Sequence, residues 1–174
     1  WPVALVIPTD VGRSDACRGL VEETLAGFGR LDALVNNAGV APSAPIEETD
    51  EPMIRGCFDV NSVGPAMIIH HAWGALRACG GSIVNVSSLA TEDPFPGFFV
   101  YAASKAALEM LALVAAREGA ESGVRAWSVA PGAVETPTLR RLFDEAALPR
   151  DRTLDPDEGA GVIVDLLTGV REEP

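Results

Sequence analysis

The chain has 174 residues, of which 48% are apolar and 22% are charged. This length supports one domain with a sizeable core, and the composition excludes a disordered or fibrous protein. The formal net charge of −12 argues against a surface that binds nucleic acid or an anionic membrane.

Three cysteines, Cys17, Cys57 and Cys79, form neither a C-x-x-C pair nor a metal-ligand spacing. We therefore expect reduced thiols in a cytoplasmic protein without a metal site. No apolar run is expected to reach the length of a transmembrane helix, and the first residues lack the basic segment of a signal peptide. The sequence thus predicts no membrane partner.

The first part of the chain predicts a strand, a helix and a second strand. Residues 3–7 form a short apolar run that is rich in β-branched side chains, as in a buried strand. Apolar residues then recur at helical spacing from Ser14, the candidate N-cap, to the glycine at 29, which suits a helix C-terminus. The next apolar run, residues 31–35, leads into Asn-Asn-Ala-Gly at 36–39.

The rest of the chain continues this alternation. A helical stretch is expected from about residue 50, with its better part over 58–78. The last helix has Asp155 and Gly169 as candidate caps. The other expected elements are a strand over 82–86, a helix over 99–121, a strand over 124–130, an irregular stretch with a short helix over 136–153 and a helix over 156–167.

Apolar strands that alternate with helices, without hairpin signals, predict an α/β fold. We expect a doubly wound parallel sheet of the Rossmann-like type, formed by a single domain over residues 1–174. Ligands of such sheets bind beyond the carboxyl ends of the strands. The loops expected at that edge contain Asp10, Asn37, Ser88 and Pro131.

The spacing of Ser88, Tyr101 and Lys105 indicates a way to make a phenol acidic. Tyr101, the only tyrosine, and Lys105 are four positions apart on a predicted helix, so they lie on one face, one turn apart. Proton transfer by tyrosine near neutrality needs its pKa lowered by about 3 units, or roughly 4 kcal/mol. An ammonium one turn away supplies on the order of 3 kcal/mol towards the phenolate. Ser88 is the candidate hydroxyl that orients a carbonyl oxygen.

Six motifs, found in the same order, resemble the short-chain dehydrogenase/reductase family, in the branch with Asn-Asn-Ala-Gly and Tyr-x-x-x-Lys motifs. Each motif is weak alone, but the ordered set, with thirteen positions from the serine to the tyrosine, is specific. The resemblance covers nearly the whole chain up to about Thr136. The motifs are Asp10-Val11, Asn36 to Gly39, Val60-Asn61-x-x-Gly64, Ser88, Tyr101 to Lys105, and Pro131-Gly132 with Thr136.

The resemblance implies an NAD(P)-dependent oxidoreductase that acts on a small carbonyl or secondary alcohol. It implies that Tyr101 is the catalytic acid/base and that Ser88 polarises and positions the carbonyl oxygen. Lys105 is similar to the lysine that lowers the tyrosine pKa and bonds the nicotinamide ribose. Asn61 is implied to hold a water that links Lys105 to solvent.

The resemblance also implies the contacts with the cofactor, NAD or NADP, and Tyr101 and Lys105 are among them. Asp10 and Val11 resemble the family positions that hold the adenine ring. The positions that contact the adenosine ribose are resembled by Asn37, Ala38 and Gly39. The segment that binds the nicotinamide is resembled by Pro131, Gly132, Val134 and Thr136. Taken one at a time, these residues are equally typical of turns, caps and strand ends.

Three other groups of residues have ordinary structural interpretations. His70 and His71 are adjacent on a predicted helix, so they point to different faces and do not form a ligand pair. Glu92 and Asp93 are typical of a solvated surface in an acidic protein. Five apolar residues suit a substrate pocket and a core equally well: Phe95, Phe98, Phe99, Leu142 and Phe143.

The chain departs from the family at its start. Family members begin with a strand and a Thr-Gly-x-x-x-Gly-x-Gly turn that binds the pyrophosphate, and no such turn occurs here. Residues 3–7 resemble the third strand of the family, so we expect an N-terminally incomplete sheet that lacks roughly 60 residues. The strand at 3–7 is then without a neighbour, and the strand at 31–35 has a bare edge. The residue that selects NAD or NADP falls in that segment.

The favoured hypothesis is hydride transfer between NAD(P) and a carbonyl or secondary alcohol. The rival is a truncated, non-catalytic subunit that keeps the site residues but does not bind the dinucleotide. Related epimerases and dehydratases are disfavoured, because they generally lack Asn-Asn-Ala-Gly and carry a larger substrate domain. The resemblance further implies a homodimer or homotetramer formed through the helices over 58–78 and 99–121.

Overall fold

The computed structural model describes residues 4–171, and its centre is a three-stranded parallel sheet. The strands β1 (Ala33–Asn36), β2 (Ser82–Val86) and β3 (Arg125–Val129) lie in the order β1-β2-β3. Ile83 and Val84 of the central strand are fully buried, as expected of a strand with helices on both sides. The predicted α/β fold with a parallel sheet is confirmed.

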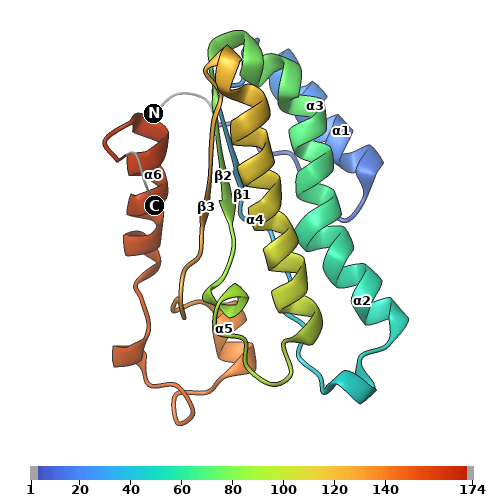
Figure 1. The fold of residues 1–174 in the computed structure, drawn as a ribbon, viewed down its shortest axis with the longest axis vertical. Coiled ribbons are helices and arrows are strands. Elements are labelled where there is room, and N and C mark those ends of the chain that lie inside the picture. The colour runs from blue at the N-terminus through green and yellow to red at the C-terminus, as the bar shows by residue number, and fades with distance from the viewer. Residues whose placement is uncertain (1–3, 172–174) are drawn as a thin grey trace.

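Helices cover both faces of the sheet (Figure 1). On one face, α4 (Phe99–Gly119) packs on β2 and β3, α3 (Gly64–Cys79) lies beside it, and α1 (Ser14–Phe28) packs against α3. On the opposite face, α6 (Pro156–Thr168) contacts β2 and buries Leu166. This two-sided cover explains why the strands are apolar runs rather than alternating patterns.

Two short helices lie near the carboxyl ends of the strands, at the lower end of the view in Figure 1. They are α2 (Glu51–Phe58) and α5 (Pro137–Leu142), the latter being the short helix expected within 136–153. The predicted caps of α6 are confirmed, since the Asp155 carboxylate accepts from the Asp157 amide and Gly169 has a left-handed φ of 75°.

The core lies between the sheet and the helices α1, α3 and α4. Side chains of α3 enter it at every fourth position, which keeps one face of the helix buried. Its buried members are Cys17, Val21, Ile68, Ala72, Leu76, Ile83, Ala115 and Val124. This cluster anchors α3 and α4, and α4 carries two of the candidate catalytic residues.

Two expectations for the first thirty residues are wrong. The predicted strand at 3–7 is absent from its described part, residues 4–7, where Leu5 and Val6 are 47% and 85% exposed. A strand needs a hydrogen-bonded neighbour, and the sheet offers none beside this segment. The predicted N-cap is also wrong, because Ser14 is the first helical residue and Arg13 occupies the cap position without a side-chain bond.

The helix expected from residue 50 to residue 78 is divided by a π-helical turn. α2 ends at Phe58, the turn spans Asp59–Val63, and α3 then begins at Gly64. Turns of this kind insert an extra residue into a helix and are frequent at functional sites. Here the turn contains Asn61, a candidate site residue.

Gly64 allows the backbone of the first loop to approach α3 closely, which gives a test of the packing. A Cβ at this position would lie 2.2 Å from the carbonyl oxygen of Val11. Gly64→Ala is therefore expected to lower the free energy of unfolding by at least ~2 kcal/mol, measured by urea denaturation. Gly74→Ala is the matched control on the same helix, because its Cβ would meet nothing within 4 Å, and it should be neutral or stabilising by up to about 1 kcal/mol. Equal effects of the two substitutions would contradict this interpretation.

One apolar stretch is longer than the sequence analysis allowed. The continuous helical segment Phe99–Ser122 is long and apolar enough to cross a membrane by length and composition alone. The core helix of a globular domain passes the same test, and this one packs along β3 and buries the polar residues Ser104 and Lys105. Its apolar content is therefore accounted for in part by the core.

Candidate active site

The carboxyl ends of the strands open into loops that meet α2, α5 and the beginning of α4 (Figure 1). Ser88 follows β2, and Pro131 follows β3 and accepts a backbone hydrogen bond from Leu89 at 3.0 Å. Tyr101 lies in the first turn of α4 and Lys105 in the second. The fold thus brings the loop of Ser88 and the start of α4 to one end of the sheet, as expected for a parallel sheet.

Tyr101 and Ser88 form the polar centre of this site. Tyr101 is half-buried, and burial raises the pKa of its phenol, while a hydrogen bond from the Ser88 side chain acts to lower it and the Cys57 thiol to raise it. The spacing of Tyr101 and Lys105 predicts a lowered pKa, so the net direction of the Tyr101 pKa is opposite to the prediction. The physical reason is that desolvation of the phenolate outweighs the Ser88 hydrogen bond.

Lys105 is the only lysine of the chain, and it is 5% exposed. Its Nζ lies 5.9 Å from the centroid of the Tyr101 ring and donates a hydrogen bond to the carbonyl oxygen of Val86 at 2.7 Å. Burial lowers the pKa of this ammonium to about 8, against a smaller opposing effect of Cys57. Because an ammonium has three donors, the contact with Val86 leaves capacity for a further acceptor.

A carboxylate on α4 holds the segment that contains Ser88. Glu109 Oε1 accepts from the Ser87 hydroxyl at 2.6 Å and from the Thr91 hydroxyl at 2.8 Å. Ser88 lies between these two anchors, and its own Oγ accepts from the Ala90 amide at 3.2 Å. Glu109 is not among the site residues predicted from the sequence, although it lies four positions after Lys105 and therefore on the same face of the helix.

The Glu109 anchor predicts an effect on the tyrosine that can be measured directly. Glu109→Ala should release Ser87 and Thr91, weaken the hydrogen bond between Ser88 and Tyr101, and so raise the pKa of Tyr101 further. Because Tyr101 is the only tyrosine, the phenolate absorbance during a pH titration reports this residue alone. Glu109→Gln keeps an acceptor oxygen and should restore the wild-type curve, whereas an exposed control on the same helix, Glu118→Ala, should not move it. An unchanged curve in Glu109→Ala would refute the anchoring role.

Asn61 fastens the loop that follows β1. Its amide is fully buried, with Oδ1 accepting from the Val40 amide at 2.9 Å and Nδ2 donating to the Val40 carbonyl at 2.8 Å. Nδ2 also donates to Ser104 Oγ at 2.9 Å. The π-helical turn aims this amide at the loop, so the side chain has a structural task of its own. Its implied role in holding a water stays a prediction.

The residues implied as cofactor contacts fall into three places. At the entry to α1, Asp10 Oδ1 accepts from the Gly12 amide at 3.0 Å, and the Val11 carbonyl faces Gly64. Asn37, Ala38 and Gly39 are exposed directly after β1. After β3, Val134 bridges to Leu154, and Thr136 caps α5 by accepting from the Leu139 amide at 3.2 Å.

The geometry at Gly39 fits the ribose end of a dinucleotide. A Cβ on this residue would lie 3.4 Å from Lys105 Nζ and 3.3 Å from Asn61 Oδ1, so a side chain would occupy the approach to the ammonium. The glycine leaves this approach open, and the buried ammonium has donors to spare for a hydroxyl. Gly39 and Lys105 thus leave room and free donors for a ribose hydroxyl, while the implied nicotinamide contacts of Pro131 and Gly132 stay a prediction.

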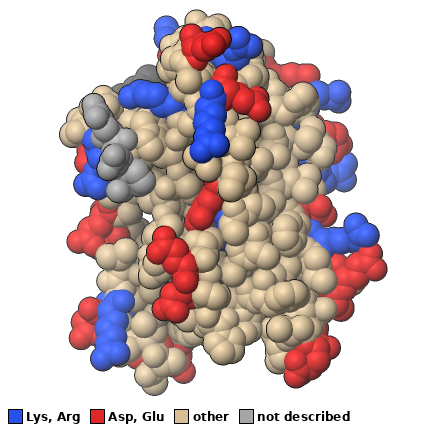
Figure 2. Space-filling view, in the orientation of Figure 1, with Lys and Arg blue, Asp and Glu red and all other residues tan. Residues whose placement is uncertain are grey.

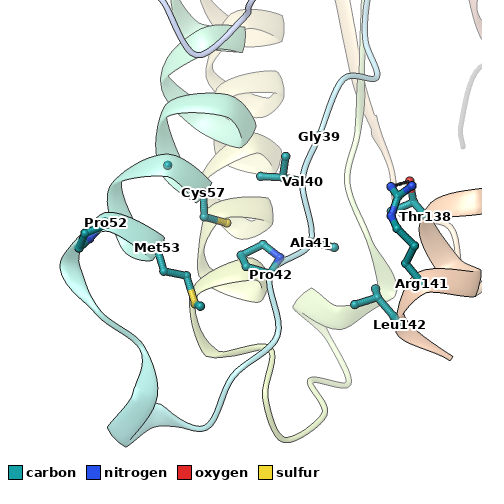
Figure 3. Close-up of a pocket in the computed structure, with 11 residues that line it drawn as sticks. Gly39, Val40, Ala41, Pro42, Pro52, Met53, Cys57, Thr138, Arg141 and Leu142 are labelled. Carbon is teal, nitrogen blue, oxygen red and sulfur yellow. Dashed lines mark hydrogen bonds between the residues drawn. The ribbon is translucent and has the colours of Figure 1, made fainter.

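An apolar pocket of about 480 Å³ lies beside Gly39, between α2 and α5 (Figure 3). Cys57 and Met53 reach it from α2, and Leu142 from α5. Cys57 also contacts Ser104 at 3.4 Å, which places the pocket next to α4. The complete lining is Gly39, Val40, Ala41, Pro42, Pro52, Met53, Gly56, Cys57, Thr138, Arg141 and Leu142.

The aromatic residues near Tyr101 divide between the two roles that the sequence left open. Phe98 is buried, with its ring 5.4 Å from the Tyr101 ring and 6.3 Å from the Phe143 ring. It therefore packs as core and supports the tyrosine. Phe95 and Phe99 are each 53% exposed, and of the five candidates only Leu142 lines the pocket.

His70 and His71 pack against each other on α3, and no metal site is found beside them or elsewhere in the described chain. The rings of His70 and His71 contact each other edge to face at 5.0 Å. Within residues 4–171, no group of three or more histidine, cysteine, aspartate or glutamate side chains is placed to hold a metal ion.

Comparisons with known proteins connect this geometry to a family. The family model described as short chain dehydrogenase matches residues 2–147. An uncharacterized oxidoreductase of Methylorubrum extorquens is 39% identical over 169 residues, covering 92% of this chain and 68% of the relative. Cis-4-hydroxycyclohexanecarboxylate dehydrogenase of Sinomonas cyclohexanicum is 39% identical over 150 residues, covering 85% of this chain and 58% of that protein.

Among solved structures, 3-ketoacyl-(acyl-carrier-protein) reductase from Brucella melitensis, complexed with NADH, is 27% identical with a TM-score of 0.86. The match covers 94% of this chain and 71% of that structure. The chain spans only 58% to 68% of the length of the two curated relatives.

Proposed function

The chain belongs to the short-chain dehydrogenase/reductase family, and from this premise we propose that it carries the proton-transfer site of an enzyme that moves hydride between NAD(P) and a carbonyl or secondary alcohol. The observation that supports the proposal most is the grouping of Tyr101, Ser88 and Lys105 at the carboxyl end of the sheet. When bound, the nicotinamide supplies or accepts the hydride.

In this mechanism, Tyr101 donates the proton. Its raised pKa keeps the phenol protonated at neutral pH, and the Ser88 hydroxyl lies beside it as a second hydrogen-bonding group. A carbonyl oxygen held by both hydroxyls is polarised by Ser88 and receives its proton from Tyr101. The protonated phenol suits carbonyl reduction, because the oxidative direction first requires the phenol to lose its proton.

Lys105 acts on the deprotonated form of Tyr101. Once Tyr101 has donated its proton, the phenolate faces a cation 5.9 Å from its ring in a buried setting, where charge interactions are strong. The ammonium is fixed by the Val86 carbonyl rather than by an acidic side chain, so its charge is not neutralised within the site. Lys105 therefore stabilises the phenolate and orients the ribose hydroxyls.

Titration of the protein with NADH and separately with NADPH, followed by nicotinamide fluorescence, tests this proposal against its rival. Saturable binding is expected for at least one of the two. Gly39→Val should weaken it, because the side chain would cover Lys105, whereas Gly74→Ala should not. Absence of saturable binding with both dinucleotides would contradict the proposal and favour the non-catalytic subunit.

The substrate class also belongs to the proposal. Relatives act, by their names, on a hydroxycyclohexanecarboxylate and a 3-ketoacyl group, which are an alcohol and a carbonyl next to an apolar body. The apolar pocket beside Gly39 and Cys57 has room for a small molecule of this kind. We accordingly propose a small carbonyl or secondary alcohol as substrate.

A homodimer or homotetramer through α3 and α4 is a further part of the proposal. The outer surface of these helices is broadly uncharged (Figure 2), and Met110, Leu113 and Val114 are each more than 40% exposed on it. A shallow groove of about 250 Å³ runs between Ile69 and Trp73 of α3 and Leu111 of α4. Large uncharged surfaces of this kind mark interfaces.

A cytoplasmic location is the last part of the proposal. The free thiols of Cys17, Cys57 and Cys79 support it.

A further inference from the structure

The pocket between α2 and α5 has a mostly apolar lining, and Arg141 is its one charged residue. Arg141 and Thr138 supply the polar side chains from α5, while Met53 and Leu142 supply apolar surface from opposite sides (Figure 3). A pocket lined in this way binds a molecule with an apolar body, and the few polar groups fix its orientation. The positive charge of Arg141 favours the binding of anionic molecules in this pocket.

Arg141 is not engaged in an ion pair within residues 4–171, in contrast to its neighbour in the sequence. Arg140 pairs with Glu135 and also donates to the Leu148 carbonyl at 2.7 Å, so it fixes the loop after α5. Arg141 donates only one described hydrogen bond, from Nη2 to Thr138 Oγ1 at 3.0 Å. A guanidinium has five donors, so most of its capacity faces solvent or the pocket.

The negative net charge of the chain makes a local cation necessary for the binding of an anion. The chain carries a formal net charge of −12, which repels an anionic ligand unless a local cation compensates for it. A guanidinium matches a carboxylate in shape, with two parallel N–H donors facing two oxygens. The opposite end of the pocket borders buried side chains of α4, because Gly39 lies next to Lys105 and Cys57 contacts Ser104.

We propose that Arg141 binds the carboxylate of an apolar carboxylic acid whose carbonyl or hydroxyl group extends from the Gly39 and Cys57 end of the pocket towards Tyr101. This inference rests on the proposed function, and it narrows the substrate class to oxo or hydroxy carboxylates. Arg141 then sets specificity by holding the end of the substrate that does not react. The interaction adds affinity for the anion and little for an uncharged analogue of the same shape.

Binding of benzoate and benzamide to the protein tests the inference without any redox step. The two probes share size and shape, and only benzoate is an anion. Calorimetry at fixed ionic strength should show benzoate binding about tenfold more tightly than benzamide. Arg141→Leu should remove this preference and leave the affinity for benzamide unchanged, whereas Arg152→Leu, an exposed arginine outside the pocket lining, should keep the preference.

Equal binding of the two probes to the wild type, or a preference that survives Arg141→Leu, would overturn the inference. Leu142→Trp checks the location, because a larger side chain should fill the pocket and weaken both probes; unaltered binding there would also overturn it. Reduction of uncharged aldehydes without any preference for benzoate sinks the carboxylate inference alone. Selective benzoate binding in a protein that fails to bind NADH and NADPH supports carboxylate binding while the proposed function fails.

Discussion

Tyr101→Phe is expected to lower the turnover of a carbonyl substrate by about a thousandfold, because general acid catalysis by a positioned side chain contributes factors of this order. The substitution removes the phenolic oxygen and keeps the ring. Phenylalanine should therefore retain the edge-to-face contact with Phe98, at 5.4 Å in the wild type, and the fold should persist. The assay is oxidation of NADH or NADPH in the presence of an aldehyde, with kcat and KM measured separately.

Three controls distinguish a chemical effect of Tyr101→Phe from a structural one. The urea midpoint should stay within the range of a surface substitution. The affinity for the dinucleotide should fall far less than the turnover, because the proposed contact between Lys105 and the ribose is retained. Ser88→Ala should also lower kcat, but less, since the proton donor remains. Activity of Tyr101→Phe near the wild-type level would show that another group donates the proton.

The parallel sheet and the position of the catalytic helix were predictable because they depend on local patterns. Residues 82–86 and 156–167 have apolar periodicity and caps that agree with their environment, and β2 and α6 follow the prediction closely. Residues 3–7 show the limit of this reasoning. Their composition is typical of a strand, but a strand depends on a neighbour in the sheet, and the sheet offers none here, as the resemblance to the family predicted.

The site shows the same division between local pattern and long-range contact. The spacing of Tyr101 and Lys105 on one helix face is a local property, so it was predictable. The anchoring of Ser87 and Thr91 by Glu109 depends on a contact between α4 and the loop after β2, across about twenty residues of sequence. The direction of the Tyr101 pKa depends on burial, which spacing does not measure.

Lys105→Met is expected to abolish activity and, near pH 7, to raise the free energy of unfolding by about 2 kcal/mol. Burial lowers the pKa of Lys105 from 10.5 to about 8. At about 1.4 kcal/mol per unit, the folded protein therefore carries a cost of ~3 kcal/mol when the ammonium is charged. Methionine fills similar space without charge, while the loss of a donor to the Val86 carbonyl costs about 1 kcal/mol.

The sign of the pH dependence follows from where each state releases its proton. Below pH 8, folded and unfolded chains both hold the proton, and the folded protein carries the full cost of a buried cation. Between about 8 and 10.5 the unfolded chain holds more protons than the folded one, so this contribution to stability rises with pH. The advantage of Lys105→Met should therefore shrink across this window and become a deficit of about 1 kcal/mol above it, because the neutral amine still donates to the Val86 carbonyl and methionine does not.

Urea unfolding of the two proteins at several pH values across this window measures that difference. Both proteins should carry Cys57→Ser, because the Cys57 thiol interacts with Lys105 and its contribution would not cancel when one curve is subtracted from the other. Arg117→Met, an exposed cation near the end of the same helix, should change stability by less than about 0.5 kcal/mol, with no trend across the window. A Lys105→Met protein that is less stable than the wild type near pH 7 would mean that the buried ammonium stabilises the fold. A site selected for catalysis is instead expected to carry this cost, because the charge that destabilises the folded protein is the charge proposed to stabilise the phenolate.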